Sequence, residues 1–72
     1  MILFSADWCS NCKPVKKFIE ENNIEGVDIV DIDTQQDVAI QYGIRGIPTM
    51  AKGNQLFIGP NEIINELRGV NE

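Results

Sequence analysis

The sequence contains no histidine, and its only two cysteines, Cys9 and Cys12, lie within one short segment. A structural zinc site takes four Cys or His ligands. A site within one chain would therefore need carboxylates to complete it, and these suit thiolate-preferring metals poorly. A metal ion or an iron–sulfur cluster shared between two chains stays open.

Basic residues are also few. The chain has six of them against eleven acidic residues, for a net charge of −5. Nucleic-acid binders need a basic surface because phosphate contacts supply most of their affinity. The composition therefore argues against a nucleic-acid partner and against anionic membranes. Lys13, Lys16 and Lys17 all follow the cysteines closely, so any positive field is local to that segment.

Long apolar runs are absent, since no stretch approaches the roughly 18 residues of a membrane span. The first residues, MILFSADW, lack the basic leader, apolar segment and cleavage site of a secretion signal. We therefore expect a cytoplasmic protein, in a compartment where thiols are kept reduced. With 72 residues, 43% of them hydrophobic, we expect one globular domain over residues 1–72 and a monomer. Its stability should be only about 3–5 kcal/mol.

The first half of the chain predicts a strand–helix–strand unit. Residues 2–5 form an apolar run suited to a buried strand, and residues 27–33 form a second one. Between them, residues 10–23 have helical periodicity, with Cys12, Val15, Phe18 and Ile19 on the apolar side. Two strands joined by such a helix pair in parallel. Three aspartates in the second strand suit a guarded sheet edge: Asp28, Asp31 and Asp33.

The second half predicts a short helix, a hairpin and a final helix. Thr34 and Asp37 resemble a capping box that opens a helix to about Tyr42, ending at Gly43. Strands at 49–51 and 55–58 flank Lys52-Gly53-Asn54, a good hairpin turn, and a helix follows from about 60 to 68. The resulting order, β-α-β-α-β-β-α, predicts an α/β fold with a four-stranded mixed sheet and helices on both faces.

Two thiols separated by two residues are poorly placed for a purely structural disulfide. Closing a four-residue loop stabilises a fold by only roughly 2 kcal/mol, against about 3 for fifteen residues. So tight a ring is also prone to strain and easily reduced. A reversible redox role is the alternative.

The redox interpretation assigns different roles to the two cysteines. At the start of a helix, the unpaired N–H groups and the helix dipole favour a thiolate, so Cys9 should be exposed and nucleophilic. Cys12 falls one turn deeper on the apolar side, where burial raises the pKa of a thiol and keeps it protonated. We therefore expect Cys9 to attack a substrate disulfide and Cys12 to resolve the mixed disulfide. Lys13 and Lys16 could add positive potential nearby, although the charge of exposed lysines is screened. Trp8 is either a core aromatic or a flat wall beside the sulfur.

Two motifs together resemble the thioredoxin family: W-C-S-N-C-K from Trp8 to Lys13 and Y-G-I-R-G-I-P-T from Tyr42 to Thr49. Members of that family carry W-C-x-x-C-K at the start of a helix and a G-I-P-T-like segment before a hairpin. The predicted element order is also similar to the minimal thioredoxin fold, and the resemblance covers nearly the whole chain. It implies a protein-disulfide reductase with a redox-active Cys9–Cys12 disulfide, no other cofactor, and disulfide-containing proteins as substrates.

The resemblance also implies that Pro48 follows a cis peptide bond and packs against the disulfide. Such a bond would expose the N–H and C=O of Ile47 beside Cys9, where an extended peptide can pair with the backbone. A trans proline in an ordinary loop is the alternative. Gly59 is either a simple turn residue or a point of close approach for the partner.

Several positions depart from the family pattern. Full-length thioredoxins begin with an extra strand and helix that this chain lacks, so the strand at 27–33 should be an outer one. Leu3 stands where thioredoxins usually hold a buried aspartate that assists the resolving cysteine. Ser10 and Asn11 replace the usual Gly-Pro between the cysteines and leave the reduction potential undetermined.

The electron donor has two candidates. Gly59-Pro60-Asn61-Glu62 only partly matches the glutathione-binding segment of glutaredoxins, and no Tyr lies between the cysteines. This favours a thioredoxin-reductase-like flavoenzyme over glutathione. The alternative functions are a glutaredoxin-like hydrogen donor to ribonucleotide reductase, a metal or iron–sulfur carrier using the same thiolates, and an adaptor whose chemistry is vestigial.

Overall fold

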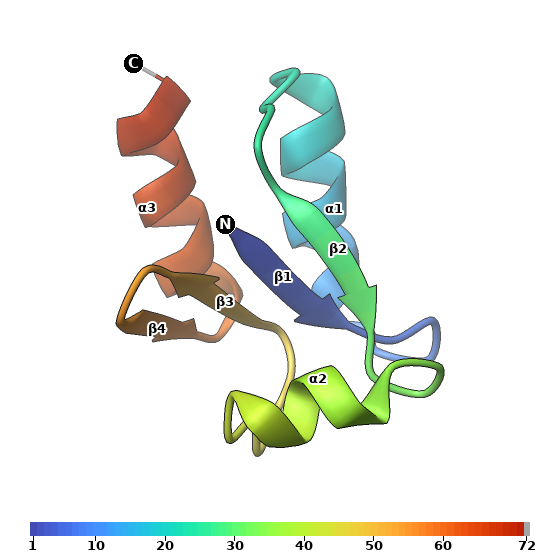
Figure 1. The fold of residues 1–72 in the computed structure, drawn as a ribbon. Helices are drawn as coiled ribbons and strands as arrows, with labels where there is room; N and C mark the ends of the chain where they lie inside the picture. Colours follow the sequence, from blue (N-terminus) through green and yellow to red (C-terminus); the bar gives the residue numbers. More distant parts are fainter. Residues whose placement is uncertain (72) are drawn as a thin grey trace.

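The structure is a computed structural model that describes residues 1–71, and its elements follow the predicted order (Figure 1). Four strands and three helices alternate as β1 (Ile2–Ser5), α1 (Cys12–Glu21), β2 (Asp28–Asp31), α2 (Gln36–Gln41), β3 (Thr49–Lys52), β4 (Gln55–Ile58) and α3 (Pro60–Asn71). None of the helices in this described part of the chain has the length and apolar character needed to cross a bilayer.

The strands form one mixed sheet in the order β2-β1-β3-β4. β1 pairs in parallel with β2, as the crossover through α1 requires, and antiparallel with β3, while β3 and β4 form the predicted hairpin. The predicted α/β fold with a mixed sheet is therefore confirmed. β1 is a central strand, so the loop that leaves its end emerges from the middle of the sheet, which is where Cys9 lies.

Successive side chains of β1 pack into two separate hydrophobic cores, one on each face of the sheet. The side chain of Leu3 packs on the face covered by α1 and α3, two helices that lie side by side in Figure 1. The side chain of Phe4 packs on the opposite face, against residues of β2, α2 and β3: Val30, Ala39 and Ala51. Alternation along a strand produces this division. Helices therefore cover both faces of the sheet, as predicted.

Helix α1 begins at Cys12 rather than at residue 10. The segment before it forms a turn instead, in which the N–H of Cys12 donates to the carbonyl of Cys9 over 3.3 Å. Pro14 lies in the first turn, where its missing N–H has no helical partner to lose. The helix ends at Glu21, and the Asn22 amide donates to the carbonyl of Phe18 over 2.9 Å.

The capping box predicted for α2 is wrong. The helix begins at Gln36, and Thr34 bonds backwards instead, its hydroxyl donating to the carbonyl of Asp31 over 3.4 Å. The carboxylate of Asp31 also accepts the N–H of Asp33 over 2.8 Å, which folds the chain into a turn. β2 therefore ends at Asp31, and Asp33 lies outside the strand to which it was assigned.

Both sheet edges carry acidic groups. β2 is an outer strand, as predicted, with Asp28 and Asp31 in it. At the other edge, Glu62 of α3 accepts the N–H of Ile58 in β4 over 3.2 Å. Gly59 links β4 to α3 with a φ of 93°, a conformation that favours glycine.

Candidate redox site at Cys9 and Cys12

Cys9 lies in the turn that follows β1. Its N–H donates to the carbonyl of Ala6 over 3.1 Å, which holds the sulfur against the end of the strand. The predicted exposure of Cys9 is wrong, since the residue is only 7% exposed. Ile32 and Ile47 pack against the cluster of Ala6 and the two cysteines and cover it.

Cys12 lies deeper, at the first residue of α1, and is 1% exposed. Both thiols are free and hydrogen-bonded to each other. Burial raises the pKa of the Cys12 thiol to about 11, and the hydrogen bond with Cys9 contributes to the rise. The burial predicted for Cys12 is confirmed, and this pKa means that Cys12 keeps its proton at neutral pH.

The lysines after the cysteines differ in position. Lys13 is exposed, whereas Lys16 is half-buried one turn beyond Cys12. The charge of Lys16 lowers the pKa of Cys12 and partly offsets the effect of burial. Because α1 starts at Cys12, Cys9 lies three residues before the helix rather than at its first turn. The predicted thiolate at Cys9 stays a prediction.

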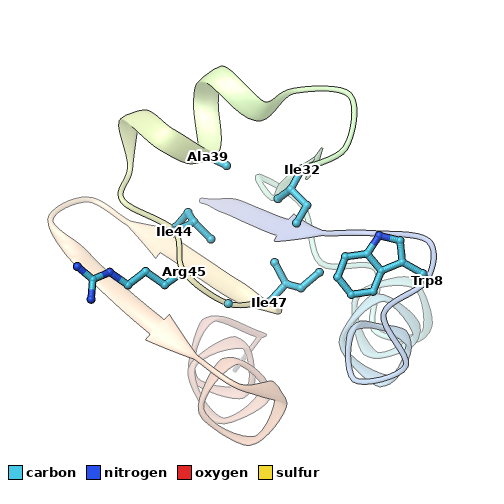
Figure 2. Close-up of a pocket in the computed structure, with 7 residues that line it drawn as sticks. Trp8, Ile32, Ala39, Ile44, Arg45 and Ile47 are labelled. Carbon is cyan, nitrogen blue, oxygen red and sulfur yellow. The ribbon is translucent and has the colours of Figure 1, made fainter.

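Trp8 is 66% exposed, so its interpretation as a core aromatic is wrong. Its indole N–H donates to the carboxylate of Asp33 over 2.8 Å, which joins the turn after β1 to the turn after β2. The indole lines a cavity of about 310 Å³. Neither cysteine lines this cavity, but Ile32 and Ile47 do, and both also pack against the cysteine cluster. Figure 2 shows the indole facing Ile32 and Ile47, while the Arg45 side chain extends away from it. The remaining lining residues are Ala39, Ile44 and Gly46.

The peptide bond between Ile47 and Pro48 is cis, as the resemblance implies. Ile47 reaches both the cavity and the cysteine cluster, and Pro48 is fully buried. The hydroxyl of Thr49 donates to the carbonyl of Gly46 over 2.6 Å, and this hydrogen bond closes a turn that contains Ile47 and Pro48. Within residues 1–71, no hydrogen bond pairs the N–H or C=O of Ile47.

The other predicted site residues, Ser10, Asn11 and Gly59, do not line the cavity. Ser10 and Asn11 are exposed in the turn between the cysteines. Gly59 does not line the cavity; its N–H donates to the carbonyl of Pro48 over 3.0 Å, which extends the hairpin pairing. The interpretation of Gly59 as a turn residue therefore fits its place in the fold. In the described residues, no three His, Cys, Asp or Glu side chains converge on a possible metal position.

Comparison with known proteins identifies the family. The sequence model described as Thioredoxin matches residues 1–71. The chain belongs to the thioredoxin family.

Relatives within the thioredoxin family are similar over most of this chain. A thioredoxin of Ophiophagus hannah is 34% identical over 73 residues, which cover 96% of this chain and 65% of that protein. Thioredoxin 1 of Nostoc sp. is 39% identical over 62 residues, covering 76% of this chain and 58% of that protein. Thioredoxin H5 of Oryza sativa is 32% identical, and the match covers 99% of this chain and 52% of that protein. The chain thus spans roughly half to two thirds of these relatives' length.

A solved structure described as a malarial protein has the same thioredoxin-like arrangement. Its TM-score is 0.55, and the match covers 94% of this chain and 91% of that one. The sequence identity is 16%, so this likeness concerns the fold alone.

The departure of this thioredoxin-family chain at Leu3 has a clear structural setting. Leu3 is completely buried between the sheet and α1, in an apolar cluster with Val15 and Met50. No carboxylate contributes to the pKa of Cys12; the groups that do are Cys9, Ala6 and Lys16. The acid that the family usually places near the resolving thiol therefore has no counterpart in β1.

Several residues at this site were not predicted. Ile32, Ala39 and Ile44 line the cavity from three different segments, and Asp33 holds the indole of Trp8. Ile32, Asp33 and Ala39 lie outside both motifs, and Asp33 is 25 positions away from Trp8 in the chain. The available signal was the second motif, which contains the lining residues Ile44, Arg45 and Gly46.

Proposed function

We propose that the chain is a thiol–disulfide oxidoreductase that reduces disulfide bonds in proteins, with Cys9 as nucleophile and Cys12 as resolving thiol. The observation that carries the proposal is the asymmetry of the pair. Cys12 is 1% exposed and keeps its proton, and its hydrogen-bonded neighbour Cys9 lies closer to the surface beside an apolar cavity. Membership of the thioredoxin family supports disulfide oxidoreductase chemistry in general.

The proposed reaction proceeds in two exchanges. Cys9, as the thiolate, attacks one sulfur of the substrate disulfide; the new bond joins Cys9 to the substrate, and the second substrate sulfur leaves as a thiolate that takes a proton from water. Cys12 then loses its proton and attacks the Cys9 sulfur. The Cys9–Cys12 disulfide forms, the bond to the substrate breaks, and the released thiolate is protonated. The substrate gains two electrons, which the dithiol loses.

Substrate binding is proposed at the cavity beside the cysteines. Trp8 and Ile32 supply apolar walls, and the main-chain groups of Ile47 have no partner within the described residues. An extended peptide could pair with Ile47 as an added strand and place its disulfide over Cys9. Because backbone groups are common to all peptides, this mode of binding would accept many protein substrates.

A thioredoxin-reductase-like flavoenzyme is the proposed electron donor, in the cytoplasm. The segment that resembles a glutathione site is already engaged in the fold. Gly59 donates its N–H to the carbonyl of Pro48, and the Glu62 carboxylate accepts the N–H of Ile58. These contacts leave fewer groups for the glutathione backbone, which makes glutathione the weaker candidate.

The other functions have less support. A role as hydrogen donor to ribonucleotide reductase would use the same dithiol, and no contact of the described residues favours that one substrate. A metal or iron–sulfur carrier would need ligands from a second chain, since Cys9 and Cys12 have no third ligand beside them among residues 1–71. Absorption spectra and metal analysis of protein purified under reducing conditions would detect such a carrier.

Insulin reduction with dithiothreitol as electron source tests the proposal. The protein should accelerate insulin precipitation, and Cys9→Ser should return the rate to that of dithiothreitol alone. Cys12→Ser should accumulate a mixed disulfide with a model substrate through Cys9, located by mass spectrometry of the digested adduct. Folded protein without activity would contradict the proposed function, and an adduct through Cys12 in the Cys9→Ser variant alone would reverse the roles.

A further inference from the structure

In the resolving step Cys12 must become a thiolate, but its buried, apolar surroundings disfavour a negative charge. To attack Cys9, the Cys12 sulfur must lose its proton, yet it is 1% exposed and buried in an apolar cluster. The turn after β1 contributes Ala6 and Cys9 to this cluster, and Ile32 and Ile47 pack on it from the segments after β2 and before β3. Apart from Cys9, none of these side chains is ionisable.

β1 supplies no acid or base either. Leu3, at the position where the family usually holds a buried aspartate, is completely buried among aliphatic side chains. Two contacts lower the pKa of Cys12: a backbone hydrogen bond from Ala6, which has the larger effect, and the positive charge of Lys16 on the same helix.

Lys16 is placed differently from the lysines on either side. It follows Cys12 by four residues, the spacing that puts two side chains on the same face of a helix one turn apart. Lys16 is half-buried, so water and salt screen its charge less than that of an exposed lysine. Lys17 has a 76% exposed side chain and forms an ion pair with Glu21 at 3.6 Å. Within residues 1–71, no ion pair engages the ammonium of Lys16.

We propose that Lys16 is a positioning residue of electrostatic type, whose charge stabilises the Cys12 thiolate during the resolving step, in a site where β1 supplies no ionisable group. This inference rests on the proposed function for its catalytic meaning. Lys16 transfers no proton. The Cys12 proton passes to water or to the departing substrate thiolate, the Cys9–Cys12 bond forms, and the Cys9–substrate bond breaks.

The test uses the pH dependence of Cys12 alkylation in the Cys9→Ser background, where Cys12 is the only thiol. The rate with iodoacetamide is measured between pH 7 and 10 by mass spectrometry of the intact protein. Lys16→Gln should lower the rate at each pH by about threefold, the effect of a charge one helical turn away in a partly solvated site. Lys16→Arg should restore it. Lys17→Gln, on the exposed side of the same helix, is the matched control and should leave the rate unchanged.

The direction of the change separates electrostatics from structural damage. A variant that merely loosened α1 would expose Cys12 and increase its alkylation, whereas loss of the charge decreases it. At 1 M salt, the difference between Lys16→Gln and its parent should shrink, because screening weakens the interaction. Equal rates for the two proteins at low salt, or a faster rate in Lys16→Gln, would overturn the proposal. The assay needs no disulfide substrate, so its outcome is independent of insulin reduction.

Discussion

The buried thiol of Cys12 predicts a stability that depends on pH in the alkaline range. The pKa of this thiol rises from 9.0 to about 11 in the folded protein, mainly because burial disfavours the charged form. The native state therefore holds the Cys12 proton more tightly than the unfolded chain does. This contribution to stability is fully present below pH 9 and is lost as the pH rises from 9 to 11.

The size of the effect follows from the shift. Two pKa units correspond to a loss on the order of 2–3 kcal/mol once the pH passes 11. The whole fold of so small a domain is expected to have only about 3–5 kcal/mol of stability, so the loss should be large enough to measure.

Urea unfolding followed by far-ultraviolet circular dichroism measures this loss. The reduced protein and its Cys12→Ser variant would be compared from pH 7.5 to 11 in the presence of a non-thiol reductant. The other ionisable groups are the same in both proteins, so the difference between the two free energies of unfolding reports on Cys12 together with its interaction with Cys9. Wild-type stability should fall relative to that of the variant above pH 9. Two parallel curves would refute the argument that burial holds the proton on Cys12.

Two further predictions concern the cavity and the core. Asp33→Ala removes the hydrogen bond to the Trp8 indole; we expect a several-fold higher KM for a peptide disulfide and altered tryptophan fluorescence, with alkylation of Cys9 unchanged as the sign that the thiols are intact. Ile63→Ala, at a completely buried position of α3, should destabilise the protein by about 2–5 kcal/mol in urea unfolding. Ile40→Ala, at a 76% exposed position of α2, should change stability by less than about 0.5 kcal/mol, and a similar loss in both variants would contradict the assigned core.

The order and type of every element could be predicted from the sequence. The strands appear as short apolar runs, and the helices as apolar residues at helical spacing. Element ends were less accurate where a side chain bonds within a turn. Thr34 has the composition of a helix cap, but it bonds back to Asp31, and competition of this kind between local hydrogen bonds cannot be read from spacing. The burial of Cys12 was predictable for the same reason as the helix, since it lies on the apolar stripe with Val15 and Ile19.

The surroundings of the site were less predictable because they come from distant parts of the chain. Cys9 lies in a turn, so exposure was the natural expectation, yet Ile32 and Ile47 cover it from two other segments. Likewise, Trp8 is a large aromatic residue of a type often found in the core, but its indole N–H donates a hydrogen bond to Asp33 at the surface. Only the tertiary fold brings such segments together. The family resemblance located the Ile47–Pro48 segment, which composition alone would have assigned to an ordinary loop.

The hydrogen bond between Glu62 and Ile58 affects where another extended polypeptide can pair with the sheet. An edge strand normally exposes N–H and C=O groups that can pair with any extended polypeptide. In the edge strand β4, the carboxylate of Glu62 from α3 already accepts the N–H of Ile58. At the opposite edge, Asp28 and Asp31 of β2 disfavour pairing with another strand because their carboxylates are charged and hydrated. Both edges of the sheet are thereby hindered from pairing with another extended chain, whereas the backbone of Ile47, where we propose that substrates bind, has no partner within the described residues. The same distribution of hydrogen-bonding groups therefore protects the sheet edges and leaves the proposed binding segment unpaired.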